Sequence, residues 1–178
     1  MIAYADIEAD YAELRDFILN DVDRIVALET GGNYAAAALI ACAHESLAKV
    51  QARKAHDTFT DTLPDAWQPV APSLFDALRN GIVHRYVTKA VVVDGTRIEI
   101  NISWREKPHL NLDKQDGVLY LNVPTMAAQL RGAFDAYEID LRANEAACRR
   151  FVERHRKARE SYPQGAELAA WRQLLAQR

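Results

Sequence analysis

Apolar residues recur at helical spacing through most of the chain, and Gly, Pro and Asn mark the places where the pattern stops. Residues 4–28 carry one apolar stripe opposite a face of Asp, Glu and Arg, and Thr30-Gly31-Gly32-Asn33 follows. Glycine after a helix can adopt the left-handed cap conformation, and asparagine is a favourable N-cap for the next helix. The sequence therefore predicts a first helix over residues 4–28 and a second over residues 34–55.

The second predicted helix is rich in alanine, and such small side chains let another helix, from the same chain or a second subunit, approach closely. Its predicted buried stripe comprises Ala35, Ala38, Leu39, Cys42, Leu47 and Val50. Glu45 lies at the edge of this stripe. Two interpretations of Glu45 remain open: an ion pair with Lys49 four residues later, or a polar group that faces a site on a neighbouring helix.

Residues 57–72 interrupt the helical pattern, because they contain three prolines among Thr and Asp residues. They are expected to form an ordered loop that Trp67 holds against the core. A short third helix is expected from Ser73, which can cap it, and its apolar positions follow at helical spacing.

The pattern then changes to alternation, which is typical of strands. Residues 89–93 and 96–103 predict a hairpin that turns at Asp94-Gly95, a favoured two-residue turn. Residues 109–112 and 118–123 predict a second pair that turns at Asp116-Gly117. The expected result is a small antiparallel β-hairpin insert over about residues 88–123.

Pro124 is expected to begin a long closing helix that extends to Arg159, followed by an amphipathic segment with Leu168, Trp171, Leu174 and Leu175. Two long helices, a loop, a short helix and a long closing helix suit an up-and-down bundle. A chain of 178 residues is expected to form one domain over residues 1–178. The predicted fold class is mainly α with a β insert.

Charge restricts the mode of any nucleic-acid binding. The net charge of −3 argues against a protein that coats nucleic acid by bulk electrostatics, so RNA would need a local basic patch. The candidate patch is Arg149, Arg150, Arg154 and Arg156 near the end of the closing helix. Cations there also complement the helix dipole, so a solvated face is the alternative interpretation.

The cysteine, histidine and hydropathy patterns indicate which cellular compartment and which cofactors to expect. Cys42 and Cys148 lie far apart in predicted helices, which suits a reducing compartment. No signal peptide and no membrane-spanning run is visible, so a cytoplasmic protein without a membrane segment is expected. The histidines lack metal-ligand spacing and there is no Cys-x-x-Cys pair, so no metal or cofactor is expected.

The third predicted helix carries Arg79, Asn80 and His84, with Tyr86 two residues later. This Arg-x4-His pattern, with a polar residue directly after the arginine, resembles the signature of the HEPN superfamily. That superfamily consists of helical proteins and includes many metal-independent ribonucleases. The longer match Arg-x4-His-x-Tyr is similar to the subset that acts as toxins in toxin–antitoxin modules.

The resemblance implies roles for these residues in metal-free RNA cleavage. His84 would move protons near neutral pH, and Arg79 would hold the phosphate through its planar, permanently charged guanidinium. Asn80 would orient the imidazole or hold a phosphate oxygen, and Glu45 would face the site. Tyr86 would be a modification site, or it would pack beside the next strand. The alternative is a frayed helix end at Asn80-Gly81, with Arg79 and His84 as solvated or structurally paired side chains.

Helix geometry limits how these groups can meet. Arg79 and His84 lie about 140° apart on an ideal helix, whereas Asn80 and His84 share a face. The length of arginine, a distortion at Gly81, or a second subunit would have to bring them together. The resemblance implies a homodimer with the two motifs side by side.

Two functional hypotheses follow. The first is a HEPN-like metal-independent endoribonuclease, in stress, phage defence or a toxin–antitoxin module with an antitoxin partner. The second is a non-catalytic HEPN-like binding or adaptor module that docks a protein or nucleotide partner.

Overall fold

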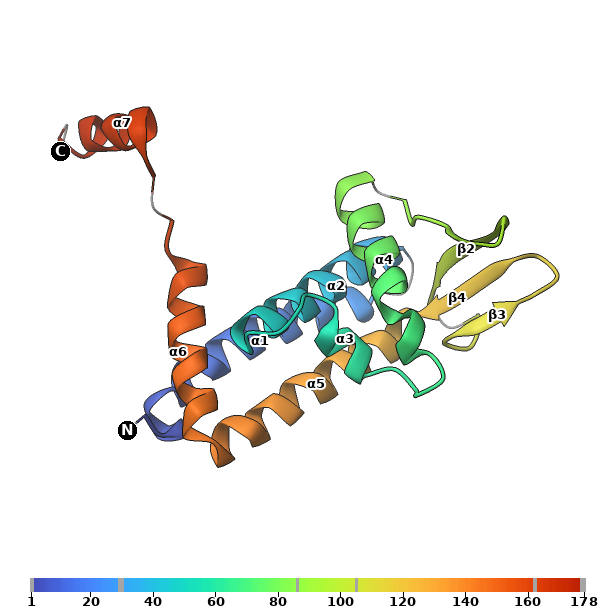
Figure 1. Cartoon of the computed structure of the whole chain (residues 1–178), viewed down its shortest axis with the longest axis horizontal. Coiled ribbons are helices and arrows are strands. Elements are labelled where there is room, and N and C mark those ends of the chain that lie inside the picture. Colours follow the sequence, from blue (N-terminus) through green and yellow to red (C-terminus); the bar gives the residue numbers. More distant parts are fainter. Residues whose placement is uncertain (1, 29–30, 86, 105, 162, 177–178) are drawn as a thin grey trace.

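Helices make up most of the chain, and α2 lies at their centre (Figure 1). A computed structural model describes residues 2–28, 31–85, 87–104, 106–161 and 163–176, and the side chains of His84 and Arg85 also lie outside this description. The elements are a 3₁₀ turn Tyr4–Asp6, α1 Glu8–Val26, α2 Asn33–Val50, α3 Asp57–Asp61, a 3₁₀ turn Gln68–Val70, α4 Ala71–Arg85, β1 Val91–Val93, β2 Thr96–Ser103, β3 Asn111–Asp113, β4 Val118–Asn122, α5 Val123–Ala143, α6 Glu145–Arg159 and α7 Gly165–Leu175.

α2 packs against α1, α3, α4, α5, α6 and the sheet. In Figure 1, α1, α2 and α5 run side by side, α6 crosses one end of them, and α4 crosses the other end beside the sheet. The alanines of α2 that face these neighbours are fully buried, namely Ala36, Ala37, Ala41, Ala43 and Ala48. Because alanine projects only one methyl group, several helices can approach the α2 axis closely at once. One hydrophobic core therefore joins helices α1 to α6 to the sheet.

The predicted buried face of α2 is wrong in its N-terminal half. Leu47 and Val50 are buried as expected, but Ala35 is exposed and Ala38, Leu39 and Cys42 are only half-buried. Alanine surrounds this part of the helix on every side, so the hydrophobic pattern does not identify one inner face. The misassigned residues form an apolar strip that no helix of the described chain covers.

The two predicted hairpins are present, but the sheet is not wholly antiparallel. β1 pairs with β2 and β3 with β4 in antiparallel fashion, while β2 and β4 are parallel neighbours in the order β1-β2-β4-β3. Asn122 helps to hold this crossover, since its Nδ2 donates to the Trp104 carbonyl at 2.5 Å and its backbone N–H donates to His109 Nδ1 at 3.1 Å. The expected antiparallel insert is thus a mixed four-stranded sheet.

The single long closing helix is also corrected. Asn144 separates α5 from α6 in an extended conformation, and its side chain accepts hydrogen bonds from the backbone N–H groups of Ala146 and Ala147. Asparagine is a strong N-cap, so it begins a new helix at a position where the apolar pattern continues without a break.

Three other boundaries differ from the sequence prediction. α2 ends at Val50 rather than near residue 55, and the expected loop of residues 57–72 contains α3 and a 3₁₀ turn. α4 begins at Ala71, so Ser73 lies inside it and does not cap it; its Oγ donates to the Val70 carbonyl at 2.9 Å. None of the helices that the structure describes is long and apolar enough to cross a membrane.

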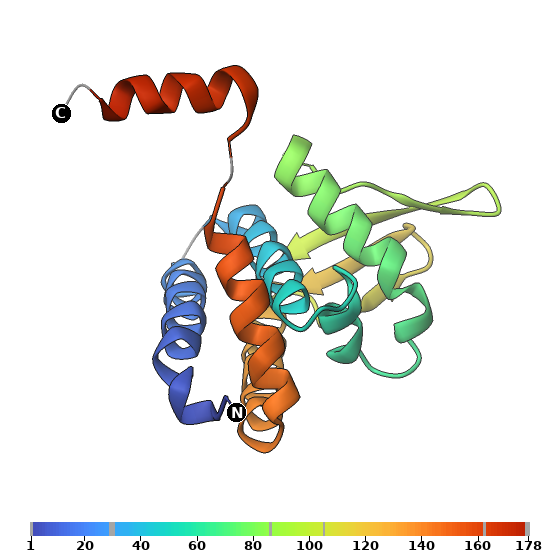
Figure 2. The same cartoon turned by 60° about the vertical axis from the view of Figure 1, so that its left-hand side comes forward.

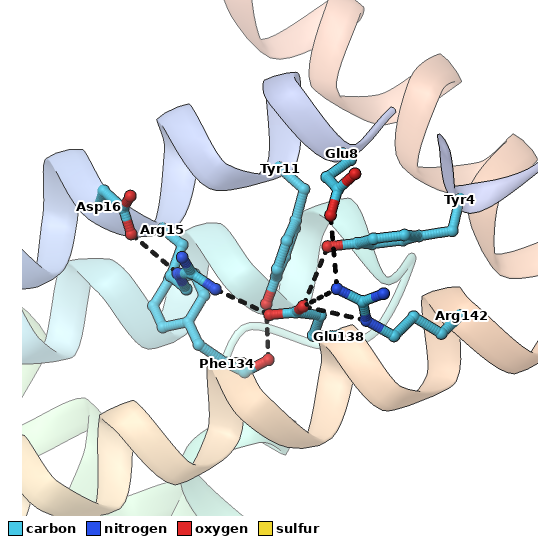
Figure 3. Close-up of polar contacts among 8 residues, drawn as sticks. All are labelled: Tyr4, Glu8, Tyr11, Arg15, Asp16, Phe134, Glu138 and Arg142. Atoms are coloured by element: carbon cyan, nitrogen blue, oxygen red, sulfur yellow. Dashed lines mark hydrogen bonds and ion pairs between the residues drawn. The ribbon is translucent and has the colours of Figure 1, made fainter. Parts of the chain in front are cut away.

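A charged cluster around Glu138 joins the start of the chain to α5 (Figure 3). Arg15 Nη1 lies 2.7 Å from Glu138 Oε2, and the Tyr4 hydroxyl donates to Glu138 Oε1 at 3.0 Å. Arg142 donates to the same carboxylate at 2.7 Å and stacks over the Tyr4 ring at 4.1 Å. Arg142, Tyr4 and Arg15 lower the Glu138 pKa, which keeps this carboxylate charged at neutral pH.

His44 is a buried polar side chain of α2, with 1% of its surface exposed. Thr58 Oγ1 donates to the His44 carbonyl at 2.7 Å, so it can accept the proton of His44 Nδ1, which lies 3.3 Å away. Burial lowers the His44 pKa from 6.5 to about 4, because there is little water to stabilise the charged ring.

We expect stability to fall with acidification between pH 6.5 and 4. In this range the unfolded chain protonates His44 and the folded chain does not, so protons favour unfolding by up to about 1.4 kcal/mol per pH unit for this group. Urea unfolding at pH 7, 6 and 5, with NMR titration of the His44 ring, would measure both effects. A His44 ring that titrates near pH 6.5 would contradict this prediction.

Candidate functional site

The packing of α4 on α2 brings Arg79 to Glu45. Arg79 Nε donates to Glu45 Oε2 at 2.9 Å, and its Nη2 lies 3.5 Å from Glu45 Oε1. Lys49 Nζ lies 2.8 Å from the same Oε1. The side chains of Glu45 and Arg79 are 14% and 32% exposed, so this ion pair lies where the hydrophobic core meets the solvent. The structure confirms the ion pair with Lys49, and it also pairs Glu45 with Arg79 on the neighbouring helix α4.

The contacts continue along α4. Arg79 Nη1 donates to Asn80 Oδ1 at 2.7 Å, and Asn80 Nδ2 donates to Asp76 Oδ1. Lys89, from the segment after α4, donates to Asp76 Oδ2 at 3.0 Å. We call these six residues, Lys49, Glu45, Arg79, Asn80, Asp76 and Lys89, the Arg79 network.

Both carboxylates of the Arg79 network are held in the charged form. Hydrogen bonds from Lys49 and Arg79 lower the pKa of Glu45, and hydrogen bonds from Lys89 and Asn80 lower that of Asp76. Because three cations then face two carboxylates, the network keeps an excess of positive charge that would favour an anionic ligand.

A pocket of about 310 Å³ lies beside the network, lined by Glu45, Ala55, His56, Pro72, Phe75, Asp76, Arg79 and Asn80. Its volume is at the lower end of the range for ligand sites. His56 brings an imidazole to the same pocket as the Arg79 guanidinium. The sequence gives little indication of this, because His56 lies 23 positions before Arg79 in a segment without a regular pattern.

Three of the residues that the sequence singles out meet here, namely Glu45, Arg79 and Asn80. His84 lies one turn further along α4, but its side chain lies outside the described part of the chain, as does Tyr86 altogether. Their places at the site remain predictions.

The basic residues of α6 divide between two faces. Arg149 and Arg156 lie on one face, 3.0 Å from Glu145 and 3.9 Å from Glu160. Arg154 lies on the other face, in a groove of about 400 Å³ lined by Lys49, Ala52, Arg53, Arg154, Lys157 and Ala158. Arg150 precedes Arg154 by one turn, and neither forms an ion pair with any described residue.

Lys49 connects this basic groove to the Arg79 network, since it contacts Glu45 and also lines the groove. Glu45 and Lys49 are spaced four residues apart and lie on one face of α2, whereas Arg53 follows the helix, which ends at Val50. The spacing of four residues is the sequence signal by which Lys49 could have been associated with the site.

The described residues contain no group of three or more His, Cys, Asp or Glu side chains that could hold a metal ion. No model of a known protein family, no curated protein and no solved structure matches the chain. The resemblance to the HEPN superfamily therefore depends on the motif and on the order of the helices.

Gly81 positions Lys89 in the network. A Cβ atom at Gly81 would lie 2.5 Å from the Val87 carbonyl oxygen and 2.7 Å from the Lys89 nitrogen. The segment after α4 can therefore fold back onto the helix, where the Lys89 N–H donates to the Ala77 carbonyl at 3.2 Å. The distortion considered for Gly81 is not found, since α4 is helical from Ala71 to Arg85.

We expect Gly81→Ala to destabilise the fold by about 1–3 kcal/mol, because the added methyl group meets backbone atoms that cannot rotate away. The matched control is Gly132→Ala in α5, where an added Cβ would meet nothing within 4 Å. That change should stabilise the protein by about 1 kcal/mol through helix propensity alone. Urea unfolding of the two variants would test the opposite signs, and equal effects would contradict the role of Gly81.

Proposed function

We propose that this protein is a HEPN-like, metal-independent endoribonuclease that acts as a homodimer. The observation that carries the proposal is the Arg79 network, in which Glu45 and Asn80 fix the orientation of the guanidinium at the edge of a pocket. A preset arginine can stabilise the charge of a pentacoordinate phosphate without reorganising during the reaction. Stress responses, phage defence and toxin–antitoxin modules are the settings that fit such an activity.

The proposed chemistry uses the 2′-hydroxyl of RNA as nucleophile. Its oxygen attacks the adjacent phosphorus and the bond to the 5′-oxygen breaks, which leaves a 2′,3′-cyclic phosphate and a 5′-hydroxyl. His84 takes the 2′-hydroxyl proton, and a second acid gives a proton to the departing 5′-oxygen. His56 at the same pocket, or His84 of a second copy, is the candidate for that acid.

The second candidate is a non-catalytic HEPN-like module that docks a protein or nucleotide. The observation in its favour is that Arg79 is already bound to Glu45, as in a structural ion pair. In that case Arg79 and His84 could be replaced without impairing partner binding.

We expect the purified protein to cleave RNA in the presence of EDTA, and His84→Ala and Arg79→Ala to lower the rate by about 100-fold or more. His56→Ala tests the second acid. Arg24→Ala is the matched arginine control, because Arg24 is 81% exposed on α1 and lies 3.7 Å from its partner Asp21. Gel analysis of several RNA classes would measure the products, and circular dichroism would confirm that each variant is folded.

Absence of cleavage of every RNA class by folded protein would count against the nuclease and favour the adaptor. Cleavage that EDTA abolishes would contradict the metal-independent mechanism. Cleavage that persists in the Arg79 and His84 variants would place the active site elsewhere.

We expect RNA to bind along the groove face of α6 and not along its opposite face. In a His84→Ala background, Arg150→Ala with Arg154→Ala should weaken binding of single-stranded RNA, and the slope of the salt dependence should fall by about 1 for each phosphate-binding arginine removed. Arg149→Ala with Arg156→Ala removes the same charge from the same helix and should have a smaller effect. Fluorescence anisotropy at several salt concentrations would compare the pairs, and equal weakening by both would contradict a defined path.

A further inference from the structure

α7 is an amphipathic helix that packs against no other element of the described chain. None of its described residues is buried, and it makes no extended contact with any other described element. Trp171, Leu174 and Leu175 are 52%, 59% and 63% exposed. Figures 1 and 2 show α7 standing away from the bundle on the segment that follows α6.

The linker explains this position. Glu160 and Gln164, at the two ends of the linker, both have extended backbone conformations. A linker of five residues, 160–164, can span at most about 18 Å, so α7 has room to lie away from the end of α6. A helix at the end of such a linker has the geometry of an element that is exchanged between copies.

α2 carries an apolar strip that no element of the described residues covers. The strip consists of Ala35, Ala38, Leu39 and Cys42, and α4 borders it with Ile82 and Val83. These residues line a hollow of about 330 Å³. It is followed along α2 by a second hollow of about 550 Å³ at the end of α6, beside Phe17, which is 74% exposed.

The helix and the strip are complementary in size and length. α7 presents large side chains, with Leu168, Trp171 and Leu175 on one face, whereas the strip presents small ones that leave room for them. Both α7 and the stretch from Ala35 to Ser46 are about 16 Å long at 1.5 Å per residue.

Charge favours an antiparallel arrangement. Glu167 in the first turn of α7 would then lie at the end of the strip where Lys49 projects. The dipoles of the two helices would point in opposite directions, which is the favourable arrangement.

We propose that α7 of one copy docks on the α2 strip of a second copy, so that two chains exchange these helices in a symmetric dimer. The inference rests on the homodimer of the proposed function and names its contact surface. It does not depend on whether the protein cleaves RNA.

The test is the mass in solution, measured by size-exclusion chromatography with light scattering over a range of concentrations. The unaltered chain is expected to be a dimer. Trp171→Asp with Leu175→Asp should give a monomer, and so should Ala38→Arg, which fills the strip. Ile139→Asp is the matched control, because Ile139 is a large apolar side chain of α5, 68% exposed and outside the strip, and it should leave the dimer intact. Circular dichroism would verify folding.

Mixing the two monomeric variants gives a sharper result. The Ala38→Arg chain keeps an intact α7 and the other variant keeps an intact strip, so together they should form a heterodimer in which one of the two helix–strip interfaces is restored. Failure to associate on mixing would overturn the exchange.

A dimer that survives the α7 substitutions, or one that needs the strip but not α7, would also overturn it. An unaltered chain that is monomeric would overturn the exchange as well. This includes a monomer in which α7 is protected from hydrogen exchange because it packs on the rest of the same chain. A monomeric chain that still cleaves RNA would leave the nuclease standing without the dimer.

Discussion

The close packing of α2 is the constraint on which the rest of the structure depends. Ala36, Ala37, Ala41, Ala43 and Ala48 are buried against several different neighbours, so a larger side chain at any of them would push a helix away from the core. Such a helix leaves only one face to the solvent. Everything that α2 contributes to function must therefore lie on that face.

That uncovered face has two halves with different chemistry. Its N-terminal half is the apolar strip, and its C-terminal half carries Glu45 and Lys49 one turn apart, with Arg53 just beyond the end of the helix. α4 crosses near the boundary, which places Arg79 against Glu45, and α6 crosses near the end, which places Arg154 in the groove with Lys49. The positions of two crossing helices thus convert one helix face into a polar network, a basic groove and an apolar hollow.

The sequence predicts those elements of the fold that depend on residues close together in the chain. The glycine turns at Asp94-Gly95 and Asp116-Gly117 indicate both hairpins, and the inner positions of α5 follow the helical period. The break at Asn144 escapes sequence prediction because the apolar period continues through it. The parallel pairing of β2 and β4 depends on tertiary contacts of Asn122, and the inner face of α2 depends on which neighbours surround a helix of alanines. At the site, a spacing of four residues allows Glu45 to pair with Lys49, whereas only tertiary packing brings His56 and Arg79 to the same pocket.

The undistorted course of α4 bears on the proposed mechanism. Since the backbone of α4 is helical from Ala71 to Arg85, positions 79 and 84 lie about 140° apart around the helix axis, so the two roles of the proposed mechanism fall on different sides of one α4. Glu45 and Asn80 further hold the guanidinium on its own side. The proposed reaction would then need His84 of a second copy at the Arg79 pocket, where His56 of the same chain is the candidate acid. The α7 helix of a second copy docked on the α2 strip would lie beside Cys42, which is one turn from Glu45, so the proposed dimer contact lies close to that pocket.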